Sequence, residues 1–128
     1  MILDTSAIVA IVTGEPRAED LLHKLNQTEA RGIGTPTLVE SAMVLTGRLR
    51  TDAESFLPGF LQEFQITVVA FGEPHWLEAS RAFRRFGKGR HPAALNFGDC
   101  MSYATARVSG QPLLCTGNDF AKTDLDLV

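Results

Sequence analysis

Four carboxylates occupy positions where a buried strand would end or a helix would begin. They are Asp4, Glu40, Asp99 and Asp119. Carboxylate oxygens are the ligands that hard divalent cations such as Mg²⁺ and Mn²⁺ prefer. A cation held in this way can lower the pKa of a water molecule and stabilise charge on a phosphate, which is the chemistry of metal-assisted hydrolysis. That chemistry requires a fold that brings the four residues together.

Each of these carboxylates also has an ordinary structural interpretation. Asp4 could cap the first helix, and Asp99 lies three residues after Asn96, as in a capping box. Glu40 could be favoured near a helix start by the helix dipole, and Asp119 could belong to a Gly-Asn-Asp turn. However, Glu40 and Asp99 lie within the apolar stretches TLVESAMVL and LNFGDCMSYA, where a solvated carboxylate is not expected. Converging carboxylates repel one another, and a bound divalent cation relieves that repulsion.

An alternation of short apolar runs and helix-forming segments would position these residues. Strands are expected over residues 1–3, 31–35, 66–71 and 111–117. Helices are expected over residues 5–12, 16–28, 36–49, 51–64, 72–87 and 96–110. This alternation predicts an α/β fold with a parallel sheet and helices on both faces. The carboxyl ends of parallel strands meet at one edge, where such folds bind ligands, so that edge should gather the four acids.

Details of three helices are also expected. Pro16 should lie in the first turn of the second helix, and Pro58 with Gly59 should kink or break the fourth. A buried stripe at helical spacing is expected on the third helix, formed by Leu38, Ala42, Leu45 and Leu49.

Composition places the chain among globular proteins. Its 128 residues are 45% hydrophobic and 21% charged, which is typical of one domain, here residues 1–128. No apolar run approaches the roughly 20 residues that span a bilayer, and no signal peptide is evident. Cys100 and Cys115 have no metal-ligand spacing, so we expect reduced, buried thiols in a cytoplasmic protein and no zinc site.

One segment departs from the acidic character of the chain. The net charge is −3, yet five of the 12 Lys and Arg residues lie between residues 81 and 90 with no acid among them. They are Arg81, Arg84, Arg85, Lys88 and Arg90. We call this the basic segment. It is either a solvated helix face followed by a loop or a binding site for a polyanion, and the sequence leaves both interpretations open.

Four segments carry a more specific signal, and they are spread over almost the whole chain. In order they are MILDTSA, TLVESAMVL, LNFGDCMSYATA and PLLCTGNDFAKTDL. Together they resemble the PIN-domain ribonucleases, and specifically the VapC-type toxins of bacterial toxin–antitoxin pairs. The resemblance implies a parallel sheet of four to five strands sandwiched by helices. It also implies Mg²⁺- or Mn²⁺-dependent cleavage of RNA.

The resemblance assigns roles to individual residues. The implied catalytic set is Asp4, Glu40, Asp99 and Asp119, with Asp4 and Asp99 as direct ligands of one or two metal ions. Many relatives carry an acid where this chain has Asn118, so the fourth position could be divided between Asn118 and Asp119. Supporting roles fall to three further residues, which could equally be helix caps: Thr5, Ser6 and Asn96.

The same resemblance implies partners. The substrate would be structured RNA, such as tRNA or rRNA, cut in single-stranded loops whose bases are accessible. The basic segment, together with His91 in the following loop, would hold RNA phosphates beside the acidic site. The regulator would be a cognate VapB-type antitoxin that docks a peptide arm on the chain, with an arginine reaching the acidic site. The toxin itself would form a two-fold homodimer.

Other functions are compatible with clustered carboxylates. A DNA nuclease or a phosphatase would use the same groups. A receiver-like or interaction domain of α/β fold could bind metal without nuclease activity. A receiver is less favoured because a single Asp follows the first strand, and because the last lysine, Lys122, lies beyond the last candidate acid, Asp119.

The stretch FLPGFLQEF concentrates large apolar side chains within nine residues. They are Phe56, Leu57, Phe60, Leu61 and Phe64. A small domain cannot easily bury all of them, so we expect a homodimer in which the antitoxin covers further apolar surface from this stretch or from the third helix. The alternative is that these side chains line the core of a compact monomer.

Overall fold

A four-stranded parallel sheet forms the centre of the structure, a computed structural model that describes residues 1–128. Its strands are β1 (Ile2–Leu3), β2 (Gly32–Gly34), β3 (Thr67–Val69) and β4 (Leu113–Leu114). They lie in the order β3-β2-β1-β4. In register, Ile2 of β1 stands opposite Gly32 on one side and Leu113 on the other. The amino-terminal strand is therefore central, and Asp4 follows it at the carboxyl edge.

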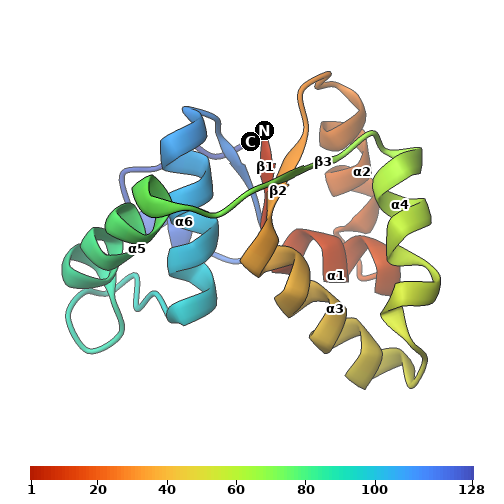
Figure 1. Cartoon of the computed structure of the whole chain (residues 1–128), viewed down its shortest axis with the longest axis horizontal. Helices are drawn as coiled ribbons and strands as arrows, with labels where there is room; N and C mark the ends of the chain where they lie inside the picture. The colour runs from red at the N-terminus through yellow and green to blue at the C-terminus, as the bar shows by residue number, and fades with distance from the viewer.

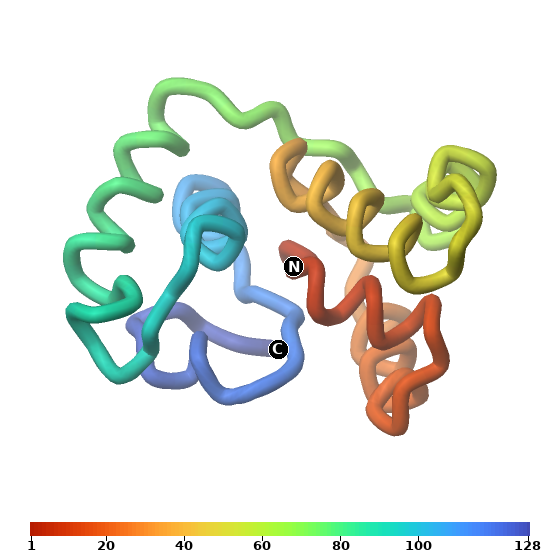
Figure 2. Tube along the Cα trace, turned by 90° about the horizontal axis from the view of Figure 1, so that it is seen from below, coloured from red at the N-terminus to blue at the C-terminus, as the bar shows by residue number.

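Helices cover both faces of the sheet. They are α1 (Thr5–Thr13), α2 (Ala18–Asn26), α3 (Thr35–Leu49), α4 (Leu57–Glu63), α5 (Glu73–Phe86) and α6 (Phe97–Ser109), with short 3₁₀ helices at Ala53–Ser55 and Phe120–Lys122. Figure 1 shows α5 and α6 on one side of the strands and α1 to α4 on the other. The view in Figure 2 separates the same two groups and places the C-terminal segment with α5 and α6. None of these helices combines the length and the apolar character that crossing a bilayer would need.

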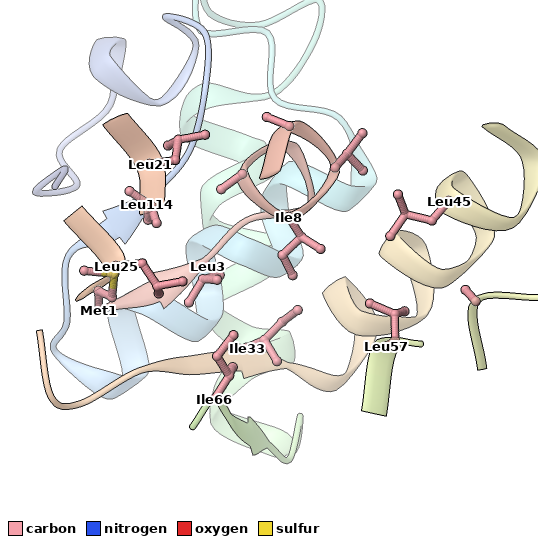
Figure 3. Close-up of a cluster of buried hydrophobic side chains, with 14 residues drawn as sticks. Met1, Leu3, Ile8, Leu21, Leu25, Ile33, Leu45, Leu57, Ile66 and Leu114 are labelled. Carbon is pink, nitrogen blue, oxygen red and sulfur yellow. The ribbon is translucent and has the colours of Figure 1, made fainter. Parts of the chain in front are cut away.

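The core consists of two hydrophobic clusters, one on each face. Successive residues of a strand point to opposite faces, so Leu3 and Leu114 join one cluster while Ile2 and Leu113 join the other. Figure 3 shows the first cluster, in which side chains from β1, β2, α1 and α2 surround Ile8 and Leu3. The second cluster joins α5 and α6 to the sheet. Because β1 contributes to both clusters, its carboxyl end is held rigidly.

Helix α6 approaches β2 closely at Gly34. A Cβ atom added to Gly34 would collide with the Thr105 hydroxyl, so glycine is required at this contact. Thr105 is fully buried, and its own hydroxyl donates to the Met101 carbonyl oxygen at 2.9 Å. The close approach carries the amino-terminal half of α6, and with it Asp99, towards the edge of the sheet where Asp4 lies.

The α/β fold and its parallel sheet were predicted correctly, but several details were not. Pro16 lies in the turn before α2, and Pro58 lies in the first turn of α4, where its missing N–H has no helical partner to lose. The helix expected over residues 51–64 is therefore broken, as predicted, but the break falls just before Pro58, which lies in the first turn of α4. Leu49, the expected end of the apolar stripe, is 40% exposed. The strand over 67–69 is an edge strand, and its Val68 is also exposed.

The apolar stretch after residue 55 packs mainly within the chain. Leu57 is buried, and Phe56, Phe60, Leu61 and Phe64 are half-buried against the first core cluster. The rings of Phe60 and Phe64 lie 4.9 Å apart between centroids. Both cysteines are free thiols, as expected, but only Cys100 is buried and Cys115 is half-buried.

Candidate active site

Three of the four predicted carboxylates line one cavity at the carboxyl edge of the sheet. The cavity has a volume of about 340 Å³. Its walls come from the start of α1, the turn after α1, one face of α3, the start of α6 and the segment after β4. The lining residues are Asp4, Thr5, Ser6, Val9, Glu15, Glu40, Val44, Arg48, Asp99 and Thr116. The sheet edge thus gathers Asp4, Glu40 and Asp99, as the alternation of strands and helices predicted.

Asp4 is the most tightly held of the three. It is 5% exposed and caps α1, because its Oδ2 accepts from the Ser6 backbone N–H at 3.0 Å and from the Ser6 hydroxyl at 2.6 Å. Ser6 Oγ in turn accepts from the Thr116 N–H at 3.0 Å. The other carboxylate oxygen of Asp4, Oδ1, accepts from the Ser102 hydroxyl at 2.6 Å. Of the two carboxylate oxygens, only Oδ1 keeps a lone-pair position unused by these bonds.

Ser102 is a site residue that sequence reasoning missed. It lies on α6, is fully buried, and hydrogen-bonds both Asp4 and the Thr37 hydroxyl, the latter at 3.1 Å. A usable signal was present, since Ser102 follows Asp99 by three residues and must share its helix face. Thr5 belongs to the same buried hydroxyl network, because it donates to the Thr37 carbonyl oxygen at 3.4 Å. Thr5 does not cap a helix, because the N-cap of α1 is Asp4.

Asp99 forms a reciprocal capping box with Asn96. The Asp99 N–H donates to Asn96 Oδ1 at 2.9 Å, and the Asn96 N–H donates to Asp99 Oδ2 at 3.0 Å. The ordinary interpretation of both residues is therefore correct, but it leaves Asp99 Oδ1 free to face the cavity. Burial raises the pKa of Asp99 to about 6, with smaller contributions from the charges of Asp4, Asp119 and Glu40 and an opposing hydrogen bond from Asn96.

Glu40 projects from the second turn of α3 towards the start of α6. Its carboxylate packs directly against the α-carbon of Gly98, so closely that a Cβ atom at residue 98 would collide with Glu40 Oε2. Glycine at this position makes room for the carboxylate beside Asp99. Glu40 lies beyond the first helical turn, so the helix dipole does not explain its presence.

The fourth acidic position lies outside the cavity wall. Asp119 and Asn118 are both exposed, and neither lines the cavity. Asp119 stands 4.0 Å from the Lys122 amino group and precedes the 3₁₀ helix at Phe120. Its charge nevertheless raises the pKa of Asp99, so it lies within electrostatic reach of the site.

The donor set suits a hard, oxygen-loving cation, although the carboxylates do not form a closed cage. No three His, Cys, Asp or Glu side chains stand close enough together to surround a metal ion. Mg²⁺ keeps several waters and is often held by one or two protein carboxylates. An open cavity in which Asp99 Oδ1 accepts no hydrogen bond and Asp4 Oδ1 keeps one lone-pair position fits this type of binding. A closed, nitrogen- or sulfur-rich site for zinc has no candidates here.

The basic segment runs along the second half of α5 and into the loop before α6. Two of its five cations are paired: Arg81 with Glu78 at 2.8 Å, and Arg85 with Asp124 at 3.0 Å. Arg90 lies over the ring of Phe83, 5.4 Å from its centroid. Arg84 and Lys88 are exposed and form no ion pair. None of the five residues lines the acidic cavity.

His91 has a structural role in that loop. Its Nδ1 accepts from the Ala93 N–H at 3.0 Å, and its ring stands edge-on to Phe86 with centroids 5.1 Å apart. It is half-buried, so its ring is only partly available to an RNA ligand.

A larger cavity of about 540 Å³ lies between α5 and α6 and has a different character. It is lined by Phe71, Trp76, Ala79, Ser80, Phe83, Phe97, Cys100 and Met101. None of these side chains is charged, so this cavity has no carboxylate that could hold a cation. The acidic cavity is the one with chemistry suited to catalysis.

Sequence comparisons agree with this geometry. The PIN domain family model matches residues 1–125. Ribonuclease VapC36 of Mycobacterium tuberculosis is 46% identical over 127 residues, which cover 98% of this chain and 91% of the relative. Ribonuclease VapC of Mycolicibacterium smegmatis is 43% identical over 128 residues, which cover 100% of this chain and 99% of the relative. These relatives favour the nuclease over a receiver-like or interaction domain.

Solved structures with the same fold are toxins. Mycobacterium tuberculosis VapC20, described as a Sarcin-Ricin loop cleaving toxin, superposes with a TM-score of 0.78 at 17% identity and covers 99% of this chain and 97% of its own. A toxin–antitoxin complex from Klebsiella pneumoniae gives a TM-score of 0.72 at 15% identity, with coverage of 99% and 95%. The fold, the family model and the close relatives agree: the chain belongs to the PIN-domain family, among the VapC ribonucleases of toxin–antitoxin systems.

Proposed function

We propose that this ribonuclease depends on Mg²⁺ or Mn²⁺ bound in the acidic cavity and cleaves structured RNA within a loop. The observation that carries the proposal is that Asp4, Glu40 and Asp99 line one cavity at the carboxyl edge of the sheet. When bound, the cation would lower the pKa of a water molecule and stabilise the charge on the phosphate and on the departing oxygen.

The residues of the chain divide this work. Asp4 and Asp99 would be direct ligands through their Oδ1 atoms. Asp99 Oδ1 accepts no hydrogen bond, and Asp4 Oδ1 keeps one lone-pair position beside its bond from Ser102, whereas the Oδ2 atoms accept the capping hydrogen bonds. Ser102 and Ser6 hold the Asp4 carboxylate in one orientation. Glu40, beside Asp99, would hold a metal-bound water molecule, or share a second ion with Asp119.

We further propose that the substrate is a single-stranded loop in tRNA or rRNA. One structural neighbour is a Sarcin-Ricin loop cleaving toxin, which favours a loop as the target. Unpaired bases in such loops are open to recognition, whereas the bases of a regular RNA helix are not. Arg84 and Lys88, which have no acidic partner, are the cations of the basic segment available to RNA phosphates, with Arg81, Arg85, Arg90 and His91 around them.

A VapB-type antitoxin and a second copy of the chain are the proposed protein partners. Two structural neighbours come from toxin–antitoxin systems, one of them VapBC2 from Rickettsia felis bound to a DNA fragment from its promoter. An apolar groove between α1, α2 and α4 offers a surface for the antitoxin, lined in part by Ile11, Leu22 and the half-buried phenylalanines 56, 60 and 64.

The proposal is tested by incubating the purified protein with total cellular RNA, with Mg²⁺, with Mn²⁺ and with a chelator, and mapping the new RNA ends. We expect discrete cuts only with a divalent cation, and a rise in melting temperature with the same cations because they bind the folded state. Cleavage that persists in the chelator would contradict metal dependence.

The assembly is tested separately. Light scattering that gives a mass near 13.9 kDa would contradict the homodimer. Addition of the antitoxin at a 1:1 ratio of chains should raise the melting temperature and suppress cleavage. A stable complex that still cuts RNA would contradict inhibition by coverage of the site.

A further inference from the structure

The acidic cavity contains one cation, and the mechanism above does not use it. Among the ten lining residues, Arg48 is the only basic side chain, and it shares the cavity with four carboxylates, namely Asp4, Glu15, Glu40 and Asp99. RNA is a polyanion, and an acidic site without a cation would repel it. A cation inside the cavity therefore needs an explanation beyond stability.

The position of Arg48 follows from the geometry of α3. Glu40, Val44 and Arg48 are spaced by four residues and lie on one face of the helix. Two helical turns separate Glu40 from Arg48, which is about 12 Å along the helix axis. Arg48 therefore lies too far along α3 to share the phosphate held at the carboxylates, and it is placed for a neighbouring phosphate of the same strand.

In the structure, Arg48 is engaged by a single carboxylate. Its Nη1 donates to Glu15 Oε1 at 3.1 Å, and the two side chains are 56% and 42% exposed. Glu15 belongs to the turn between α1 and α2, so the pair joins two elements that line the cavity, this turn and α3. An ion pair this exposed contributes little to stability, and its guanidinium is free to exchange one anionic partner for another. The planar guanidinium group can bind two oxygens of a phosphate, as it binds two oxygens of a carboxylate.

The basic segment cannot bind a phosphate inside the acidic cavity. None of its residues lines the cavity, and two of its arginines are held by Glu78 and Asp124. It can hold RNA at a distance from the carboxylates, but the phosphate beside the cleaved one would meet Arg48.

We propose that Arg48 is a substrate-positioning residue that binds the RNA phosphate next to the cleaved one, and that Glu15 occupies its guanidinium until RNA displaces it. This inference rests on the ribonuclease activity proposed above. It makes opposite predictions for the two members of one ion pair. Loss of Arg48 should weaken RNA binding, whereas neutralising Glu15 should strengthen it by removing the competing carboxylate.

The test compares R48Q and E15Q with a matched pair on α2, K24Q and D20N. Lys24 and Asp20 form an ion pair at 3.2 Å, and neither lines the cavity. The substrate is an RNA fragment that spans a cleavage site mapped with the wild-type protein. Steady-state cleavage gives KM and kcat, and fluorescence anisotropy in a chelator gives binding over a range of salt concentrations.

R48Q should raise KM by about tenfold, the usual size of a lost charge-assisted hydrogen bond, and change kcat much less. It should also lower the slope of log binding constant against log salt by about 0.7, the value for one contact to a single strand. E15Q should lower KM by about threefold. D20N and K24Q should stay within about twofold of wild type in both measurements.

Two results would overturn the inference while leaving the ribonuclease intact. One is an R48Q protein with wild-type KM and salt slope. The other is a parallel loss of activity and melting temperature in R48Q and E15Q, which would make the pair a strut between α3 and the turn after α1. A wild-type protein that cuts no RNA with Mg²⁺ or Mn²⁺ would instead overturn the proposed function, and it is recognised before any variant is compared.

Discussion

The hydroxyl of Ser102 on α6 donates a hydrogen bond of 2.6 Å to Asp4 Oδ1, and the two residues are 98 positions apart in the chain. Asp4 ends the central strand, and Ser102 lies one turn beyond Asp99. This bond therefore fixes the distance between the two carboxylates that are the best candidates for direct metal ligands. It also means that Asp4 contributes to stability as well as to chemistry.

Replacement of Ser102 by alanine should separate these contributions. The change leaves Asp4 Oδ1 without its buried donor and should lower the free energy of unfolding by about 1–2 kcal/mol. Loss of an orienting partner of a metal ligand should reduce cleavage by about tenfold or more. Urea unfolding and cleavage rates at several Mg²⁺ concentrations would measure both effects. Ser109, exposed on the same helix, provides the control, because S109A should change stability by less than about 0.5 kcal/mol. Unchanged cleavage in S102A would remove the positioning role.

Asp99 should make the stability of the metal-free protein depend on pH. Burial raises its folded-state pKa to about 6 from a usual value of 3.8. Between those pH values the folded protein holds the Asp99 proton more tightly than the unfolded chain does, so stability falls as pH rises from about 4 to about 6 and stays lower above that. Because the group is only half-buried, the total should be about 1 kcal/mol after solvent screening.

The variant D99N keeps an acceptor for the Asn96 N–H but cannot ionise. We expect it to be more stable than wild type at pH 7.5, nearly equal at pH 4, and inactive against RNA at both. Melting curves in a chelator at the two pH values measure the first part. A stability difference that is the same at pH 4 and pH 7.5 would contradict the assigned pKa. In the wild type, protons compete with the metal, so Mg²⁺ should raise the melting temperature more at pH 7.5 than at pH 5.5.

Gly98 offers a way to move Glu40 without changing its charge. An alanine at position 98 would place its Cβ in contact with Glu40 Oε2 and displace the carboxylate. At other helical positions, replacing Gly by Ala usually raises the free energy of unfolding by about 0.5–1 kcal/mol. We expect G98A to lose about tenfold or more in cleavage rate while its melting temperature stays near or above that of wild type.

Gly47 on α3 is the matched control for this change. A Cβ atom there meets nothing within 4 Å, so G47A should gain stability and keep full activity. If G98A cleaves RNA as fast as G47A, the position of Glu40 is not important for catalysis.

The basic segment should be tested through its unpaired members. R84E with K88E should weaken RNA binding and reduce its salt dependence, with little change in stability, because neither side chain has a partner to lose. R85E is the informative contrast. Arg85 donates to Asp124, which also accepts from Tyr103 at 2.6 Å and from Arg107, so its reversal should lower the melting temperature. If the salt dependence of RNA binding is unaltered in R84E/K88E, the basic segment is a solvated helix face and does not bind RNA.

The order of strands and helices, and the shared edge of Asp4, Glu40 and Asp99, could be predicted because apolar periodicity and parallel topology determine them. The position of the break near Pro58 could not, because proline both breaks and begins helices and only the packing of Leu57 on the core decides between them. Ser102 and Arg48 were missed for a different reason. Their importance depends on which groups face them across the cavity, and those partners, Asp4 and Glu15, lie far away in the sequence.

The central place of β1 has a consequence for synthesis of the protein. β1 can complete its hydrogen bonding only when β4, far later in the sequence, has also emerged from the ribosome. Pairings between such distant segments form slowly. The same delay applies to the Thr116 N–H that bonds Ser6 in the cavity wall. A nascent chain therefore has no assembled cavity until the segment after β4 has been made, and the nuclease cannot attack RNA before that point.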